Sequence, residues 1–173
     1  MVGPSSSHTA GACRIGNLAS SVFSKKPQEL IIDLHGSFAE TYKGHGTDRA
    51  IVGGILGYET DDPRIIEALE EAENLNLKIS YRRMDLGPVH PNTARINFLE
   101  DGEIVCSVTG SSIGGGQVRI VEVDGIDTNL DGKAWSVIMT YKDRPKMIFD
   151  LTSRVADYNL NIATMSVTRK DEE

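Results

Sequence analysis

The sequence predicts an α+β fold in which helices pack on a mixed, largely antiparallel sheet. Near the start, apolar residues from Ala12 to Phe23 recur close to every 3.6 positions, which predicts an amphipathic helix. After Thr93, short alternating segments are separated by Asp-Gly pairs, which is typical of hairpins. Residues 133–173 suggest a strand, a helix and a second strand. We therefore expect an α+β domain over 1–132 and a partial βαβ module over 133–173.

Strands and helices alternate in the first half of the chain. A buried strand rich in Leu and Ile is expected over 29–36, and another strand over 77–82. Between them, Lys43 to Asp48 forms a predicted strand-to-helix loop, with Thr47 or Asp48 as cap of the next helix. Asp62 followed by Pro63 predicts an N-cap and a first helical position. His90-Pro91-Asn92 is expected to be a turn, because a residue before proline avoids the helical region.

Short strands dominate the second half. Ala94, Ile96 and Phe98 alternate with polar residues and predict a strand that pairs across Asp101-Gly102. Further strands are expected at 104–109, 117–123 and 126–130, with a glycine-rich loop over 111–116. Two more strands, 135–141 and 162–168, flank a helix that would begin at Asp143-Arg144-Pro145.

Composition excludes several classes of protein. The 173 residues carry a net charge of −7 and few aromatic side chains, which argues against nucleic-acid binding. No run of about twenty apolar residues predicts a membrane span, and no signal peptide is visible, so we expect a cytoplasmic protein. Cys13 and Cys106 lie far apart, which favours two free thiols and gives no metal site in this chain alone.

The segment Gly3 to Thr9, Gly-Pro-Ser-Ser-Ser-His-Thr, is the most informative part of the sequence. It places three hydroxyl groups, an imidazole and backbone N–H groups at the start of the first predicted helix. A helix start leaves N–H donors unpaired, and the helix dipole favours anions there. A carboxylate or phosphate would fit, with His8 beside it to move a proton. The alternative is an ordinary serine-rich cap, for which one serine would suffice.

Three other predicted loops carry similar residues: Lys43-Gly44-His45-Gly46, His90-Pro91-Asn92 and Ser112 to Gly116. Together with the first segment they suggest a shared pocket for a small anionic molecule. Lys43 either steers an anion or is simply solvated. His35 lies within an apolar strand and is interpreted as structural, and Asp48 as a helix cap rather than a base.

Five segments carry a resemblance to a known family: 3–9, 36–38 (Gly-Ser-Phe), 43–48, 90–92 and 112–116. Their residues, order and approximate spacing resemble the β part of the bacterial iron–sulfur L-serine dehydratases, as far as about Leu130. From Asp143 the chain resembles an ACT domain, a regulatory module for small molecules, with Lys146 where that family usually has glycine. An ACT domain needs βαββαβ, and only its first βαβ is expected here, as in a truncated domain.

The resemblance implies a reaction and a partner. That family deaminates L-serine to pyruvate and ammonia with a [4Fe–4S] cluster and without pyridoxal phosphate. Its cluster cysteines lie in the α part, so this chain would be a β subunit, inactive without an α subunit that holds the cluster. We expect a heterodimer or larger assembly, with L-serine as substrate and neither nucleic acid nor membrane as partner.

Roles for individual residues follow from the residue types and the resemblance together. His8 and His45 are the catalytic candidates, because imidazole titrates near the working pH. The group that removes the α-proton is not assigned. The substrate-binding candidates are Ser5, Ser6, Ser7, Thr9, Lys43, Gly44, His90, Asn92, Ser112, Gly114 and Gly115.

Two other functions fit the same sequence. The chain also resembles the allosteric substrate-binding domain of some D-3-phosphoglycerate dehydrogenases, a module that binds an anion and regulates without catalysing. A scaffold that only stabilises an α partner is the third possibility. The Ser-Ser-Ser-His string favours the dehydratase over both.

Overall fold

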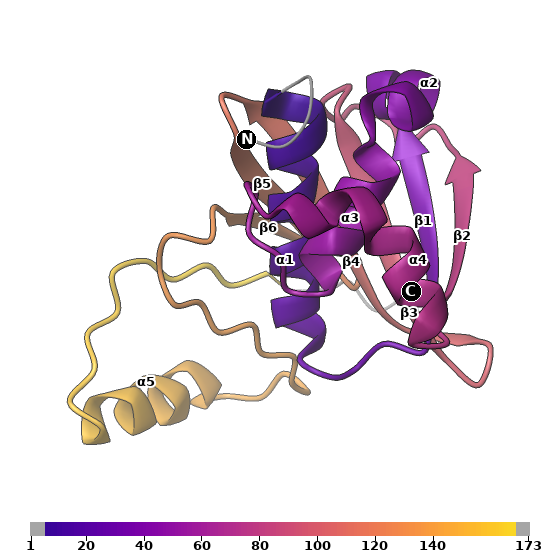
Figure 1. Cartoon of the computed structure of the whole chain (residues 1–173). Helices are drawn as coiled ribbons and strands as arrows, with labels where there is room; N and C mark the ends of the chain where they lie inside the picture. The colour runs from indigo at the N-terminus through magenta and orange to yellow at the C-terminus, as the bar shows by residue number, and fades with distance from the viewer. Residues whose placement is uncertain (1–5, 169–173) are drawn as a thin grey trace. The chain divides into compact units, whose positions relative to one another are not determined.

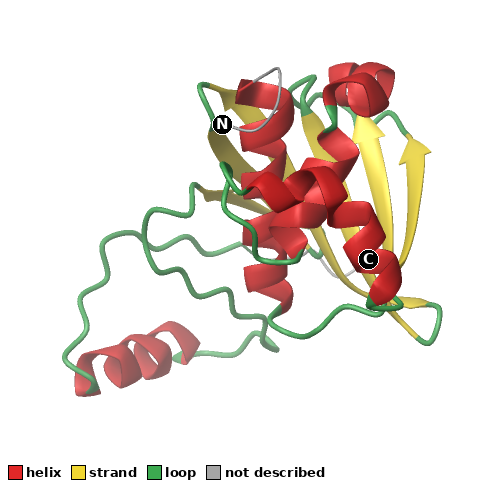
Figure 2. Cartoon of the chain, in the orientation of Figure 1, coloured by secondary structure: helices red, strands yellow, loops and turns green. Residues whose placement is uncertain are grey.

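The computed structural model describes residues 6–168 and divides the chain into two compact units, 1–136 and 137–173. The first unit has two layers, with its helices gathered on one face of a sheet (Figures 1 and 2). This architecture confirms the predicted α+β class. No helix in the described residues is both long enough and apolar enough to cross a membrane.

The sheet has six strands in the order β2-β1-β3-β4-β5-β6. β1 and β2 are parallel, and every other neighbouring pair is antiparallel. The strands are β1 (Glu29–His35), β2 (Lys78–Arg83), β3 (Thr93–Glu100), β4 (Glu103–Gly114), β5 (Gln117–Val123) and β6 (Ile126–Leu130). Each overlaps a segment in which the sequence predicts a strand.

The helices of the first unit bury their apolar faces against alternate residues of the strands. α1 contacts β3, β4 and β5, and Phe23 at its end stacks on Phe98 of β3 with ring centroids 4.4 Å apart. The elements are η1 (Ser6–Gly11, a π-helix), α1 (Ala12–Phe23), α2 (Gly36–His45), α3 (Thr47–Ile55), η2 (Pro63–Glu67, a 3₁₀ helix) and α4 (Ala68–Asn74). Asp62 caps η2 and accepts from the Arg64 N–H at 2.9 Å, as its sequence predicts.

α1 and α3 cross at two glycines. A Cβ on Gly16 would lie 2.1 Å from the Ile51 carbonyl oxygen, and one on Gly54 would lie 2.0 Å from that of Cys13. Both distances are far below van der Waals contact, so any side chain at either position would push the helices apart. The backbones of α1 and α3 are therefore in direct contact.

Two of the predicted loops are wrong. Residues 43–45 are the last turn of α2, not a strand-to-helix loop, and Gly46 rather than Thr47 or Asp48 is the N-cap of α3. Residues 111–114 belong to β4, so that only the end of the expected glycine-rich loop is a turn. In both places the polar composition suggested a loop, whereas contacts with the rest of the fold hold the segment in regular structure.

The second unit contains α5 (Met147–Asp157), close to the helix expected after Asp143-Arg144-Pro145. The strands expected at 135–141 and 162–168 are wrong, because the structure has neither segment in a sheet. A strand needs a neighbour to take its backbone hydrogen bonds. The described residues offer 135–141 and 162–168 no such neighbour. Assignment of 133–173 to an ACT domain stays a prediction.

Candidate active site

The predicted site segments gather at one end of the sheet. His35 at the end of β1 pairs with Thr93 at the start of β3, and Thr93 pairs with Ser111 near the end of β4. The Ser112 N–H then donates to the Asn92 carbonyl at 2.8 Å, and the Phe38 N–H to that of Pro91 at 3.5 Å. The 90–92 turn thus ties the start of α2 to the end of β4.

η1 completes this end of the first unit. A Cβ on Gly11 would lie 2.0 Å from the Ser112 Oγ, so only glycine lets η1 approach β4 this closely. η1 runs directly into α1. Ser6 is exposed, Ser7 and His8 are half-buried, and Thr9 is buried. Ser5 lies outside the described residues.

The imidazoles of His8 and His45 lie side by side. Their ring centroids are 4.8 Å apart, and the His8 ring also meets the buried Phe38 ring edge-on at 5.3 Å. His8 Nε2 is hydrogen bonded to Ser37 Oγ at 3.1 Å. Burial, and secondarily the neighbouring His45, lowers the pKa of His8 below its ordinary 6.5, so that the neutral ring is favoured. The structure therefore brings both predicted catalytic histidines together.

His45 ends α2, and the left-handed Gly46 (φ 69°) turns the chain into α3. The Thr9 hydroxyl donates to the His45 carbonyl at 3.4 Å, which joins η1 to the end of α2. Two buried atoms next to this bend, His45 Nδ1 and Thr47 Oγ1, have no hydrogen-bond partner within the described part of the chain. Buried polar atoms are usually paired, so these two atoms are candidates for contact with a ligand.

Lys43 and Gly44 are less suited to binding than the sequence suggested. Because both lie in the last turn of α2, their backbone N–H groups serve the helix rather than an anion. Lys43 is exposed, with its ammonium 5.9 Å from the centroid of the Tyr42 ring. That position fits a solvated side chain as well as one that steers an anion.

Local hydrogen bonds hold the 90–92 turn in its conformation. His90 is exposed, and its Nδ1 accepts from the Asn92 N–H at 3.1 Å. Its carbonyl accepts from the Thr93 hydroxyl at 2.6 Å, and that hydroxyl also contacts the Ser111 hydroxyl at 2.7 Å. These bonds support a structural role for His90 and place the Asn92 backbone against β4.

Ser112 is fully buried within β4, and its Oγ has no partner among the described residues. The Ser112 N–H already donates to the Asn92 carbonyl, so this backbone donor is not open to a ligand as the sequence predicted. Gly114 at the end of β4 and Gly115 in the turn that follows have positive φ values of 100° and 59°. Arg14 on α1 donates to the Gly116 carbonyl at 2.9 Å and fixes this turn against the helix.

Sequence reasoning did not single out Ser37, Phe38 or Thr47 as site residues. Ser37 and Phe38 occur only within the Gly-Ser-Phe segment that carries the family resemblance. The spacing of Phe38 and Tyr42 could have revealed them. The two residues are four positions apart, so they would lie on one face of a helix that begins directly after a predicted strand. It would have placed Ser37 in a first helical turn beside the histidine loops.

The chain's own thiols do not fit an iron–sulfur cluster. Cys13 lies in α1 and Cys106 in β4, both are buried, and the Cys13 thiol donates to the Tyr58 carbonyl at 3.3 Å. Burial raises the pKa of each thiol to about 11, which disfavours the thiolate that iron requires. In residues 6–168, no cluster of three or more His, Cys, Asp or Glu side chains could hold a metal ion.

We expect both thiols to resist alkylation in the folded chain. A pKa of about 11 instead of the ordinary 9.0 leaves about a hundredfold less thiolate at pH 8. Iodoacetamide labelling at pH 8, followed by intact mass, should therefore be at least that much slower in buffer than in urea. Rapid labelling of either cysteine in buffer would contradict its burial.

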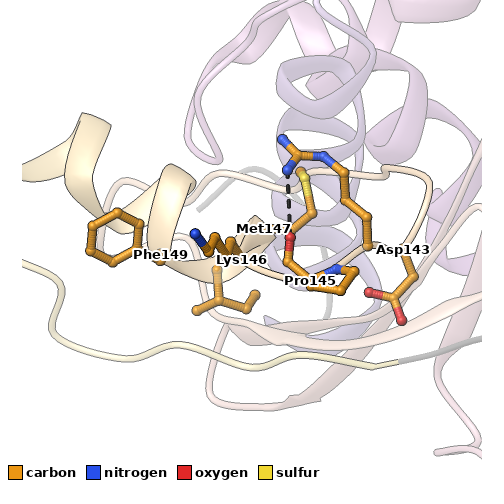
Figure 3. Close-up of a pocket in the computed structure, with 7 residues that line it drawn as sticks. Asp143, Pro145, Lys146, Met147 and Phe149 are labelled. Carbon is orange, nitrogen blue, oxygen red and sulfur yellow. Dashed lines mark hydrogen bonds between the residues drawn. The ribbon is translucent and has the colours of Figure 1, made fainter.

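A hollow of about 470 Å³ occurs within the second unit and is lined by residues 143–149 (Figure 3). The Arg144 guanidinium donates to the Pro145 carbonyl at 3.5 Å and to the Asp150 carboxylate at 2.9 Å. Lys146 has φ 71°, a left-handed conformation that favours glycine, which is the residue the ACT family usually has there. None of the predicted site residues lines this hollow.

Comparison with known proteins shows the family of the chain. The family model described as serine dehydratase beta chain matches residues 1–122, which include every predicted site residue. The chain belongs to the serine dehydratase beta chain family. It is 45% identical over 172 residues to the probable L-serine dehydratase, beta chain, of Bacillus subtilis (strain 168), covering 99% of this chain and 77% of the relative.

Two further relatives bear on the alternatives. The L-serine dehydratase, beta chain, of Peptoniphilus asaccharolyticus is 43% identical over 173 residues, covering 99% of this chain and 78% of its own. A D-3-phosphoglycerate dehydrogenase of Synechocystis (strain PCC 6803) is 23% identical over 158 residues, which cover 90% of this chain and 28% of that enzyme. The serine dehydratase beta chain relatives are thus nearly twice as similar.

Proposed function

We propose that this chain is the β subunit of an L-serine ammonia-lyase and completes an active site shared with an α subunit. The assembled enzyme would convert L-serine to pyruvate and ammonia. Membership of the family and the printed names of the two beta-chain relatives support the reaction. The observation that most supports this site is that the imidazoles of His8 and His45 lie beside the start of η1, with ring centroids 4.8 Å apart.

Elimination from serine requires that the α-proton leaves, the β-hydroxyl departs as water, and the carboxylate is held. The resulting enamine becomes an imine, which water hydrolyses to pyruvate and ammonia. In this proposal the N–H groups at the start of η1, with Ser6 and Ser7, would hold the carboxylate. His8, whose neutral ring is favoured, can accept or return a proton as a general acid–base catalyst, and the adjacent His45 is the second candidate for this role.

The printed name of the two relatives, beta chain, supports an α subunit as partner. Its two buried thiols do not fit a [4Fe–4S] cluster, so the cluster that the family resemblance implies would be held by the partner. We expect the isolated chain to be inactive, and the pair to work in the cytoplasm, where both thiols stay reduced. We further propose that 1–132 is the catalytic β-type domain and 133–173 the first part of an ACT domain.

The test is to purify the chain without oxygen, alone and co-expressed with its cysteine-bearing partner, and to assay pyruvate from L-serine. Activity in the pair and not in the separate subunits would support the proposal. A stable pair with an intact cluster and no activity on any hydroxy amino acid would contradict it. In that case the binding-module alternative, to which the D-3-phosphoglycerate dehydrogenase relative points, would be preferred.

A further inference from the structure

One ring nitrogen of His35 has two neighbours that require opposite charge states of the ring. His35 Nδ1 accepts a hydrogen bond from the Leu86 N–H at 3.1 Å, and it also lies 3.5 Å from the Asp85 carboxylate. A backbone N–H can only donate, so the first contact requires an unprotonated Nδ1. A carboxylate accepts, so it is a partner for the protonated nitrogen. The two hydrogen bonds therefore cannot form at the same time.

Asp85 is the carboxylate that the structure places against the His35 ring. Asp33, two positions earlier on β1 and on the same side of the strand, is held by Arg82 of β2 at 2.6 Å. On β3, the residue opposite His35 is the uncharged Thr93, and the first turn of α2 contains no charged residue. The other charged side chains of the adjoining strands at this end are those of Arg95, which is paired with Glu122, and Arg83, which lies beside Leu34.

His35 also holds the segment 84–89, which connects β2 to the 90–92 turn. Two N–H groups of this segment donate to β1: that of Met84 to the Leu34 carbonyl at 2.9 Å, and that of Leu86 to His35. Loss of the Leu86 contact would leave residues 85–89 without a backbone hydrogen bond to the sheet. The remaining hydrogen bonds of the segment, from the Gly87 N–H to Asp85 and from the Val89 N–H to the Gly87 carbonyl, stay within it.

We propose that His35 is a pH-sensitive switch for this segment. With the ring neutral, its proton is on Nε2 and Nδ1 accepts from Leu86. When a proton from solvent adds to Nδ1, that nitrogen becomes a donor, loses the Leu86 N–H and pairs with Asp85, so residues 85–89 are released from β1. The Leu86 contact is thus lost as the pH falls. Because the segment leads into the 90–92 turn, the switch would couple acidity to the end of the sheet that carries the candidate active site.

The 90–92 turn supplies an internal comparison. His90 Nδ1 accepts from the Asn92 N–H at 3.1 Å, so this contact also requires an unprotonated nitrogen. The Asp85 carboxylate, however, lies against His35. Both amides should lose protection from exchange in acid, but only the Leu86 amide should respond to a change at Asp85.

The test is hydrogen exchange of the Leu86 amide in the full chain, followed by NMR from about pH 8 to about pH 5, the range in which imidazole changes its charge. Each rate is compared with that of an unstructured peptide at the same pH, because acid itself slows exchange. We expect the protection of Leu86 to fall by about threefold to tenfold, the range that one ordinary hydrogen bond supports. The Met84 amide should keep its protection, since its acceptor is a carbonyl. Ring ¹⁵N shifts report the charge of His35 in the same samples.

Two variants separate the switch from other effects of acid. His35→Asn places an amide oxygen, which does not titrate, near the position of Nδ1, so its Leu86 protection should be independent of pH. Asp85→Asn removes the partner of the charged ring but keeps an oxygen that can accept from the Gly87 N–H. It should keep Leu86 protected to lower pH than in the parent, without changing the Asn92 amide.

Three outcomes would overturn the switch. One is unchanged Leu86 protection in the parent when the His35 ring is charged, and another is a ring that stays neutral down to about pH 5. The third is the same loss of protection in His35→Asn as in the parent, which would assign the release to another group. All these measurements use the chain alone, so their failure would leave the proposed function intact, and an inactive pair would leave the switch intact.

Discussion

His8→Ala in the assembled pair is expected to lower kcat for L-serine by about 10²- to 10⁴-fold, the usual contribution of a positioned acid–base group. The imidazole lies beside the start of η1, where the substrate carboxylate would bind, and against His45. Burial and His45 lower its pKa, so it is neutral and able to accept a proton at pH 7. For the same reason, the acidic limb of kcat/KM in the parent should lie below pH 6.5.

Steady-state kinetics of the parent, His8→Ala and His8→Gln in the pair would measure this effect. The glutamine variant keeps a polar side chain near Ser37 but cannot transfer a proton at this pH, so it should be nearly as slow as alanine. Gel filtration and the visible spectrum of the cluster would show that assembly is intact. An unchanged rate with a shifted effector response would favour the regulatory module. If His8→Ala and His45→Ala both kept the parent rate, the scaffold would be favoured.

Gly54→Ala should be the most destabilising of the small substitutions, by about 3 kcal/mol in the free energy of unfolding. The new methyl would lie 2.0 Å from the Cys13 carbonyl oxygen and 2.8 Å from the Asn17 nitrogen. Both atoms belong to the backbone of α1, so no side-chain rotation relieves the overlap. The helices would have to separate, and the apolar contacts around the crossing would loosen with them.

Urea denaturation followed by circular dichroism would test this value. Gly44→Ala is the matched control, because Gly44 is also in a helix but a Cβ there meets no atom within 4 Å. Alanine at an open helical position is more favourable than glycine by up to about 1 kcal/mol, so this variant should be as stable as the parent or more so. Equal midpoints for Gly54→Ala and the parent would refute the close crossing of α1 and α3.

Much of the fold could be predicted because the residues that form it repeat regularly. The apolar face of α1 and the alternation in β3 each depend on local spacing, which the sequence displays. α2 was missed because Phe38 is its one buried residue, so it shows little helical periodicity. The strands expected at 135–141 and 162–168 have suitable residues, but pairing depends on neighbours that no local pattern reveals.

The candidate site was predictable in part for a similar reason. His8 and His45 stand in segments whose composition is unusual, so both were found from the sequence. The Ser37–His8 hydrogen bond joins residues 29 positions apart, and only the folded chain brings them within 3.1 Å. Ser112 was expected in an open loop, whereas pairing with Val118 of β5 places it in a buried strand.

The backbone contact between α1 and α3 has a consequence for insertions and deletions. His8 lies on η1, which continues into α1, and His45 lies directly before α3, so the glycine crossing anchors both imidazoles to one rigid pair of helices. One residue added between Gly11 and Gly16 would turn everything before it by about 100° around the helix axis, since a helix has 3.6 residues per turn. His8 would then face away from His45. The same addition in the connection between α3 and η2 would leave both rings where they are.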